Sequence, residues 1–319
     1  MKKKKIVKVL AVTAGVLVFL GAAGSVVFGG YVADRILHQN KDNDTIDNSL
    51  KQLEVWGYDI DGFMNTHEGS QISAQAEDGN IVPATYFDNG SNKCVILVHG
   101  AGGDRVSTYP LAEQYIEDGY DVIAIDQRGS GVNPDDRVTF GINERLDIEA
   151  MVRYAREALG AAEVIVHGQS MGAQTTAIYA SNVTPGDVCA ADAVICDSPV
   201  PGMELMLRLM FGGSEDAVNS ATANYLVGTS KFYMKVFDGI DYDDGDTIAV
   251  VADDQLPTLI IVSLQDEVCL PHYVEQIYDN IASDQKDIIY VDSAHIEGVI
   301  DDPEGYMDGV EAFLSGAGL

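Results

Sequence analysis

Short apolar runs rich in Val and Ile recur along the chain and alternate with stretches that carry a helical spacing of apolar residues. Such runs are typical of strands that are buried on both faces of a parallel sheet. We expect strands at Cys94–Val98, Val122–Ile125, Val164–Val166, Ala193–Ile195, Leu259–Val262 and Ile288–Val291. We expect helices at Arg145–Leu159, Met171–Ala180, Tyr273–Ile281 and Pro303–Leu314. The alternation predicts an α/β fold, with helices on both faces of a mostly parallel sheet.

The N-terminus carries the features of a membrane anchor. A basic cluster, Lys2–Lys5, precedes an uncharged run from Val9 to Ala33. A helix over this run would be roughly 37 Å long, enough to cross a bilayer core of about 30 Å. Because the lysines lie on the N-terminal side, we expect that end in the cytoplasm and the rest of the chain outside it. The predicted organisation is a cytoplasmic tip and transmembrane signal-anchor over residues 1–33, a polar juxtamembrane linker over 34–53, and one globular domain over 54–319.

A cleaved signal peptide is the alternative interpretation of this segment. It would use the small residues Gly21–Ser25 as its cleavage site and would release a secreted protein. The apolar run continues through Val26–Val32, which favours an uncleaved, single-pass anchor in the cell membrane.

Composition excludes several classes of partner and cofactor. The chain has 19 basic and 50 acidic residues, for a net charge of −31. Such a surface repels phosphate backbones, so we expect no nucleic-acid partner. The four cysteines show neither a CxxC pair nor a spacing with histidine that indicates zinc, so we expect no metal. A disulfide between Cys196 and Cys269 is compatible with an oxidising compartment, and the sequence leaves it open.

The strongest chemical signal is the segment Gly168–Gly172, which reads Gly-Gln-Ser-Met-Gly. It follows the expected strand Val164–Val166 and opens the expected helix at Met171. This is the GxSxG nucleophile elbow in its required context, in which a strained turn points the Ser170 hydroxyl out of the sheet. The glycines leave room for the neighbouring backbone, and the helix N-terminus supplies partial positive charge.

From about Cys94 to its C-terminus, the chain resembles the α/β-hydrolase superfamily. The run Val95–Ala101 resembles the family's strand that ends in His-Gly, and Asp126–Gly131 resembles its DxRGxG loop. Pro257–Asp266 resembles the strand and loop that carry the acid, although Ser263 stands where glycine is common. Together with the anchor, these features are similar to those of membrane-anchored bacterial esterase-like hydrolases. The resemblance implies an α/β-hydrolase fold with a small cap or crossover insertion.

The order of serine, acid and histidine along the chain identifies candidates for the other catalytic groups. Of the six histidines, His295 alone lies between the last expected strand and the last helix, so we expect it to be the base. Asp266 follows the preceding strand and is the expected acid. Asp197 is its main rival, and the weaker ones are Glu267 and Asp292.

Two backbone N–H groups are expected to form the oxyanion hole, those of Ala101 and Met171. Asp126 and Arg128 are expected to form a turn-stabilising ion pair near the site rather than to take part in chemistry.

About residues 199–256 form an unusually long connection between two expected strands and are rich in Met, Leu, Phe and Tyr. They fit one or two ordinary crossover helices that pack on the sheet. They also fit a small cap over the active site whose apolar residues line an acyl pocket. The sequence leaves both interpretations open.

These features predict a serine hydrolase that cleaves carboxylic esters through an acyl-enzyme on Ser170 and needs no cofactor. An aminopeptidase or amidase is the alternative, because this fold and these groups also cleave amides. A different class, a catalytically silent binding protein tethered to the membrane, stays open. The expected partners are a small-molecule ester or peptide substrate and, through the N-terminal helix, the membrane.

Overall fold

The computed structural model describes the backbone of residues 2–319 and the side chains of residues 13–319. The Lys2–Lys5 cluster therefore lies outside the residues whose side chains are described. The chain divides into two compact units: Met1–Leu37 with Glu204–Asp243, and His38–Met203 with Asp244–Leu319. This division joins the N-terminal helix to the long connection, whereas the sequence analysis placed the two in separate parts of the chain.

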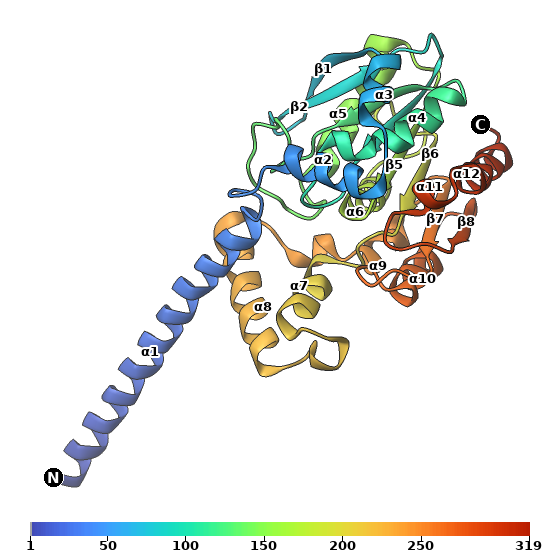
Figure 1. Ribbon diagram of the computed structural model, residues 1–319. Helices are drawn as coiled ribbons and strands as arrows, with labels where there is room; N and C mark the ends of the chain where they lie inside the picture. Colours follow the sequence, from blue (N-terminus) through green and yellow to red (C-terminus); the bar gives the residue numbers. More distant parts are fainter. Residues whose placement is uncertain (1) are drawn as a thin grey trace. The chain divides into compact units, whose positions relative to one another are not determined.

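The larger unit contains the sheet (Figure 1), which has eight strands within the described residues. The strand order is β1-β2-β4-β3-β5-β6-β7-β8. β2 pairs antiparallel with β1 and with β4, and all the other neighbours pair parallel. The strands are β1 Gly69–Gln75, β2 Ile81–Phe87, β3 Lys93–Val98, β4 Asp121–Ile125, β5 Glu163–Gln169, β6 Ala193–Asp197, β7 Thr258–Ser263 and β8 Lys286–Val291. The mostly parallel α/β sheet is confirmed.

All six strands expected from Val- and Ile-rich runs are present, and they are the six parallel members of the sheet. β4, β6 and β7 are buried along their whole lengths, as expected of strands with helices on both faces. β1 and β2 form a hairpin, with Ser70, Gln71, Ser73 and Gln75 of β1 exposed. β1 carries few apolar residues, and Pro83 interrupts the apolar run of β2, so their sequence predicts them less clearly.

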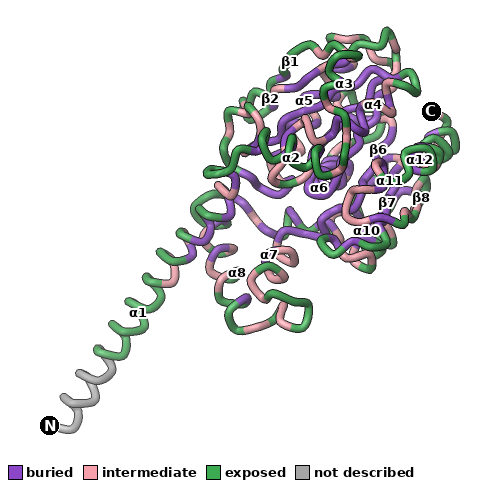
Figure 2. Tube along the Cα trace, viewed as in Figure 1, coloured by how far each residue is buried: buried purple, intermediate pink, exposed green. Residues whose placement is uncertain are grey.

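Two apolar cores cover the two faces of the sheet, and the buried residues follow the strands in Figure 2. One core is formed with helices such as α4 and α12, through Leu111 and Val310. The other is formed with α5 and α6, through Met151 and Tyr179. The helices of this unit are α2 Thr45–Trp56, α3 Ile60–Thr66, α4 Tyr109–Glu117, α5 Glu144–Tyr154, α6 Met171–Ala180, α9 Thr247–Val250, α10 Pro271–Asn280, α11 Gly298–Asp301 and α12 Pro303–Ala317.

The expected juxtamembrane linker contains α2, a regular helix of the larger unit. Asp44 caps it by accepting a hydrogen bond from the Asp47 backbone N–H, and Gly57 ends it in the left-handed conformation. Thr45, Ser49 and Leu53 are four residues apart, and they are its buried face. This segment is therefore an integral part of the larger unit.

The smaller unit combines α1 (Lys2–Leu37) with an insertion between β6 and β7 that contains α7 (Met203–Gly212) and α8 (Ala221–Tyr233). Within the described residues, Thr13–Leu37 is a helical segment long and apolar enough to cross a membrane. A membrane anchor and a signal sequence share these properties.

α8 packs against the C-terminal half of α1, and Figure 1 shows the two side by side. The hydroxyl oxygens of Ser25 and Tyr225 are 3.0 Å apart, and the Phe28 and Tyr225 rings stack with their centroids 5.9 Å apart. A Cβ atom added at Gly29 would lie 2.4 Å from a carbonyl oxygen of α8, so glycine permits the close approach of the two backbones. Neither sequence interpretation of the insertion includes this helical partner.

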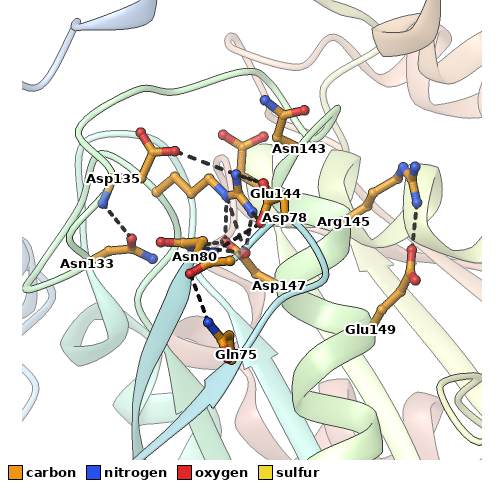
Figure 3. Close-up of polar contacts among 12 residues, drawn as sticks. Gln75, Asp78, Asn80, Asn133, Asp135, Asn143, Glu144, Arg145, Asp147 and Glu149 are labelled. Carbon is orange, nitrogen blue, oxygen red and sulfur yellow. Dashed lines mark hydrogen bonds and ion pairs between the residues drawn. The ribbon is translucent and has the colours of Figure 1, made fainter.

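Asp78, Asn80, Asp135 and Asp147 converge in a polar cluster (Figure 3), and the buried Arg128 side chain forms ion pairs with its three aspartates. Its guanidinium donates to Asp147 at 2.7 Å and to Asp78 at 2.6 Å. The expected pairing with Asp126 is wrong: the Asp126 carboxylate instead accepts from Arg105 at 2.6 Å. Both ion pairs tie the loop after β4 to its surroundings.

Asp254 is fully buried, and burial raises the pKa of its carboxyl to about 6 from the ordinary 3.8. Its two oxygens accept from the Leu256 N–H at 2.9 Å and from the Thr258 hydroxyl at 2.8 Å. A carboxyl whose pKa is raised on folding favours the folded state when it is protonated. Its contribution to stability is therefore full below about pH 4 and is lost as the pH rises through about 6.

We predict that Asp254→Asn raises the free energy of unfolding at pH 7 by about 2–3 kcal/mol. The amide keeps both contacts. Its oxygen can accept from the Leu256 N–H, and its nitrogen can donate to the Thr258 hydroxyl. That hydroxyl then donates to the Leu256 carbonyl, which already lies 3.0 Å from it in the wild-type chain. Chemical denaturation of the full chain across pH tests this, with the exposed Asp253→Asn as the matched control. An equal gain in the free energy of unfolding at pH 3.5 would contradict a raised pKa for Asp254.

Candidate active site

Ser170 stands at the turn between β5 and α6, with φ 57° and ψ −119°. This backbone conformation is strained for a residue other than glycine. A Cβ at Gly172 would lie 2.1 Å from the Val98 carbonyl oxygen, and one at Gly168 would lie 2.3 Å from the Gly172 carbonyl oxygen. The two glycines therefore let the start of α6 sit directly on β3 and β5, which is what makes the turn sharp.

The structure brings together the three side chains expected from the sequence. The Ser170 hydroxyl lies 2.7 Å from Nε2 of His295, and Nδ1 of His295 lies 2.6 Å from Oδ2 of Asp266. The other Asp266 oxygen accepts from the backbone N–H groups of Val268 and Cys269 at 2.7 and 2.8 Å. A buried carboxylate held in this way orients the imidazole so that Nδ1 donates to it and Nε2 can accept from the serine.

The rival acids lie elsewhere. The Asp197 side chain accepts from Tyr306 and Ser198, each at 3.0 Å, and burial raises its pKa. Its backbone carbonyl accepts the Ser170 N–H at 2.8 Å, so Asp197 supports the elbow through its main chain. Glu267 and Asp292 are exposed. Of the four candidates, Asp266 is the one bonded to His295.

Two further histidines are buried in structural networks. The Gln127 backbone N–H donates to Nε2 of His99, so Nδ1 carries the proton and donates to the Gly100 carbonyl at 2.7 Å. His167 lies between the hydroxyls of Tyr115 and Tyr306, and burial lowers its pKa to about 3. Both rings are therefore neutral and serve packing.

Comparison with known proteins bears on the fold. A sequence profile of the α/β hydrolase fold matches residues 93–211, which include the strand before His99, the DxRGxG loop and the elbow. The chain has the α/β-hydrolase fold. It is 22% identical over 223 residues to the uncharacterized protein YqkD of Bacillus subtilis (strain 168), covering 69% of this chain and 70% of YqkD.

Solved structures share this fold. An esterase from Pyrococcus furiosus superposes with a TM-score of 0.63 at 21% identity, covering 81% of this chain and 95% of the esterase. A bacterial membrane phospholipase A superposes with a TM-score of 0.57 at 18% identity, covering 99% of each chain.

α2 holds the loop that follows β3. The Asn48 amide donates to the Gly102 carbonyl at 3.1 Å, and the Ser49 hydroxyl accepts the Asp104 N–H at 2.9 Å. This loop contains Ala101, one of the two expected oxyanion donors. The sequence analysis missed the role of α2 because it treated these polar residues as linker. The buried positions at intervals of four and the single tryptophan, Trp56, are signals that could have indicated it.

A cleft of about 420 Å³ opens over Ser170. It is lined by Asn48, Ser49, Gln52 and Trp56 of α2, by Gly100–Gly103 and Ser107 of the loop after β3, and by Val268, His295, Ile296 and Glu297. All of these residues belong to the larger unit. The cleft therefore has one wall made by the segment that directly follows α1.

Cys269 lies beside the candidate site, and its sulfur, an Asp266 oxygen and a His295 nitrogen lie within 4.8 Å of one another. Burial and the neighbouring carboxylates raise the pKa of the Cys269 thiol well above its usual value. A protonated thiol is a poor metal ligand, and Asp266 already accepts three hydrogen bonds. The residues therefore do not suit a metal ion. Cys269 and Cys196 are both free thiols.

Proposed function

We propose that this chain is a serine hydrolase that cleaves carboxylic esters of small molecules. The observation that carries the proposal is the continuous hydrogen-bonded path from Asp266 through His295 to Ser170, which begins at a buried carboxylate and ends at a strained elbow. An esterase is among the structures that share the fold. The amide, hydroxyl and indole groups that line the cleft give it both polar and apolar surface, which small esters need.

In the proposed reaction, His295 takes the proton of Ser170 as the serine oxygen attacks the ester carbonyl. Asp266 stabilises the imidazolium that forms. The backbone N–H groups of Ala101 and Met171 stabilise the oxyanion, Met171 being the first residue of α6 and therefore without an intrahelical acceptor. His295 then protonates the leaving alcohol, and the acyl group stays on Ser170. Water activated by His295 releases the acid and restores the serine.

We further propose that α1 is an uncleaved membrane anchor and that the larger unit lies outside the cytoplasm. The support comes from the smaller unit. Cleavage within Gly21–Ser25 would cut α1 directly before Phe28 and Gly29, which contact α8, and would remove the helical turns that lead into this contact. The retained helix is a folding partner of the insertion, and a disposable signal peptide would have no such role.

We predict that Ser170→Ala lowers ester turnover by a factor on the order of 10⁶ and leaves the fold intact. The reason is loss of the nucleophile. A fluorophosphonate probe, which reacts with activated serines, should label the wild type and not the variant. Near-normal hydrolysis by the folded variant would assign the chemistry to another residue, and an unlabelled, inactive wild type would favour a silent binding protein.

Asp266→Asn should lower kcat by roughly 10⁴, as a comparable change does in serine proteases, because an amide favours the wrong imidazole tautomer. Asp197→Asn should cost less than about tenfold, since the Asp197 side chain does not contact His295 and mainly accepts hydrogen bonds from neutral groups. Steady-state kinetics of both variants measure the ranking. The reverse order would make Asp197 the acid.

The full-length protein should stay in the membrane fraction, with the residues before Gly21 still attached. Protease added outside wall-free cells should digest the larger unit. Leu20→Arg adds roughly 2.5–3.5 kcal/mol to the free energy of membrane insertion of this helix. It should reduce the membrane fraction without affecting Ser170 labelling. Membrane fractionation, mass spectrometry of the N-terminus and protease protection test this. A mature N-terminus near Ser25, or full protection inside cells, would contradict the proposed topology.

A further inference from the structure

A carboxylate and an indole face the cleft together. Nε1 of Trp56 donates to Oε1 of Glu297 at 3.0 Å, and both side chains line the cleft over Ser170. Both are half-buried. Glu297 lies two residues after His295, so their Cα atoms are at most about 7.6 Å apart. The pair is thus within reach of a group attached to an ester at the serine.

The backbone that places Glu297 is strained. Ile296, between His295 and Glu297, has φ 56°. This left-handed conformation is rare and strained for a β-branched residue. The strained residue joins the proposed base to the cleft carboxylate, so the same turn determines where both side chains lie.

Glu297 has no cationic partner among the described residues. None of the cleft-lining residues is a lysine or an arginine, and no ion pair of the described side chains includes Glu297. Among the described residues that line the cleft, Glu297 is the one Asp, Glu, Lys or Arg side chain. The cleft therefore has a negative wall, and the chain as a whole, with a net charge of −31, adds to its potential.

We propose that Trp56 and Glu297 form a subsite for a positively charged ammonium group of the substrate. This inference rests on the proposed hydrolase function and narrows its substrate class to cationic esters. An ammonium group gains both from a carboxylate and from the face of an indole ring. A phosphate or carboxylate at the same position would be repelled by Glu297 and would find no positive side chain in the cleft.

Trp56 is the only tryptophan of the chain, so its fluorescence reports on the subsite directly. Choline added to the full-length protein should change this fluorescence in a saturable way. An alcohol in which a tert-butyl group replaces the trimethylammonium group should not. Glu297→Gln keeps an acceptor for the indole N–H but removes the charge, and it should abolish the response. Glu54→Gln removes an equal charge from an exposed position of α2 that does not line the cleft, and it should retain the response.

Two matched pairs of esters test where the ammonium group lies. Butyrylcholine against its tert-butyl isostere places the charge in the alcohol, and β-alanine ethyl ester against ethyl butyrate places it in the acyl group. For at least one pair we expect kcat/KM to favour the cation by about tenfold or more. Glu297→Gln should remove that preference, Glu54→Gln should keep it, and added salt should weaken it.

The outcomes separate the subsite from the proposed reaction. Saturable choline binding that depends on Glu297, with no hydrolysis of any ester, would support the subsite and reject the hydrolase. Hydrolysis and Ser170 labelling without any cationic preference in either pair, and without a choline response, would overturn the subsite and leave the hydrolase intact. A preference that survives Glu297→Gln would also overturn it.

Discussion

The close approach of α6 to the central strands is the constraint on which the rest of the candidate site depends. Val98 ends β3, and its carbonyl oxygen occupies the space that a side chain at residue 172 would need. With glycine there, the helix begins directly over the sheet, and the turn before it forces Ser170 into its strained conformation. The serine hydroxyl then emerges above the carboxyl ends of the parallel strands, where the loops bearing Asp266 and His295 also arrive.

A second dependence links the start of the larger unit to this site. α2 follows α1 after a short turn, and its polar side chains hold the loop that contains Ala101. The same helix supplies Trp56 to the cleft wall. A segment whose composition resembles a tether thus contributes both to the proposed oxyanion hole and to the proposed substrate subsite.

The smaller unit rests on a different kind of contact. α1 and α8 meet through glycine, small hydroxyl side chains and stacked rings, which allow two backbones to approach closely. The insertion is held internally by an ionic network in which Lys231 contacts both Glu204 and Asp243. These contacts explain why residues far apart in sequence form one compact unit, and they provide a structural reason for the chain to keep its N-terminal helix.

Much of the larger unit could be predicted from local patterns. Val- and Ile-rich runs identified the six parallel strands, because a strand buried on both faces must be apolar throughout. The glycine spacing around Ser170 identified the elbow, because its backbone geometry tolerates few other residues there. β1 and β2 were less clear, since the exposed polar residues of β1 dilute its apolar signal and Pro83 interrupts that of β2. The ion pairs of Asp126 and Arg128 were not predictable either, because their partners, Arg105, Asp78 and Asp147, come from separate loops and helices.

What the sequence by itself determined is the fold class, the sharp GxSxG turn at Ser170 and a short set of candidate acids and bases, all of which depend on residues near one another in the chain. The tertiary structure decided which carboxylate contacts His295, since only long-range packing brings Asp266, and not Asp197, to Nδ1. It also decided that α2 lines the cleft, that Glu297 meets Trp56 across 241 positions of sequence, and that α8 packs on α1. Contacts of this kind depend on how the helices pack around the sheet, and no local pattern of residues encodes that arrangement.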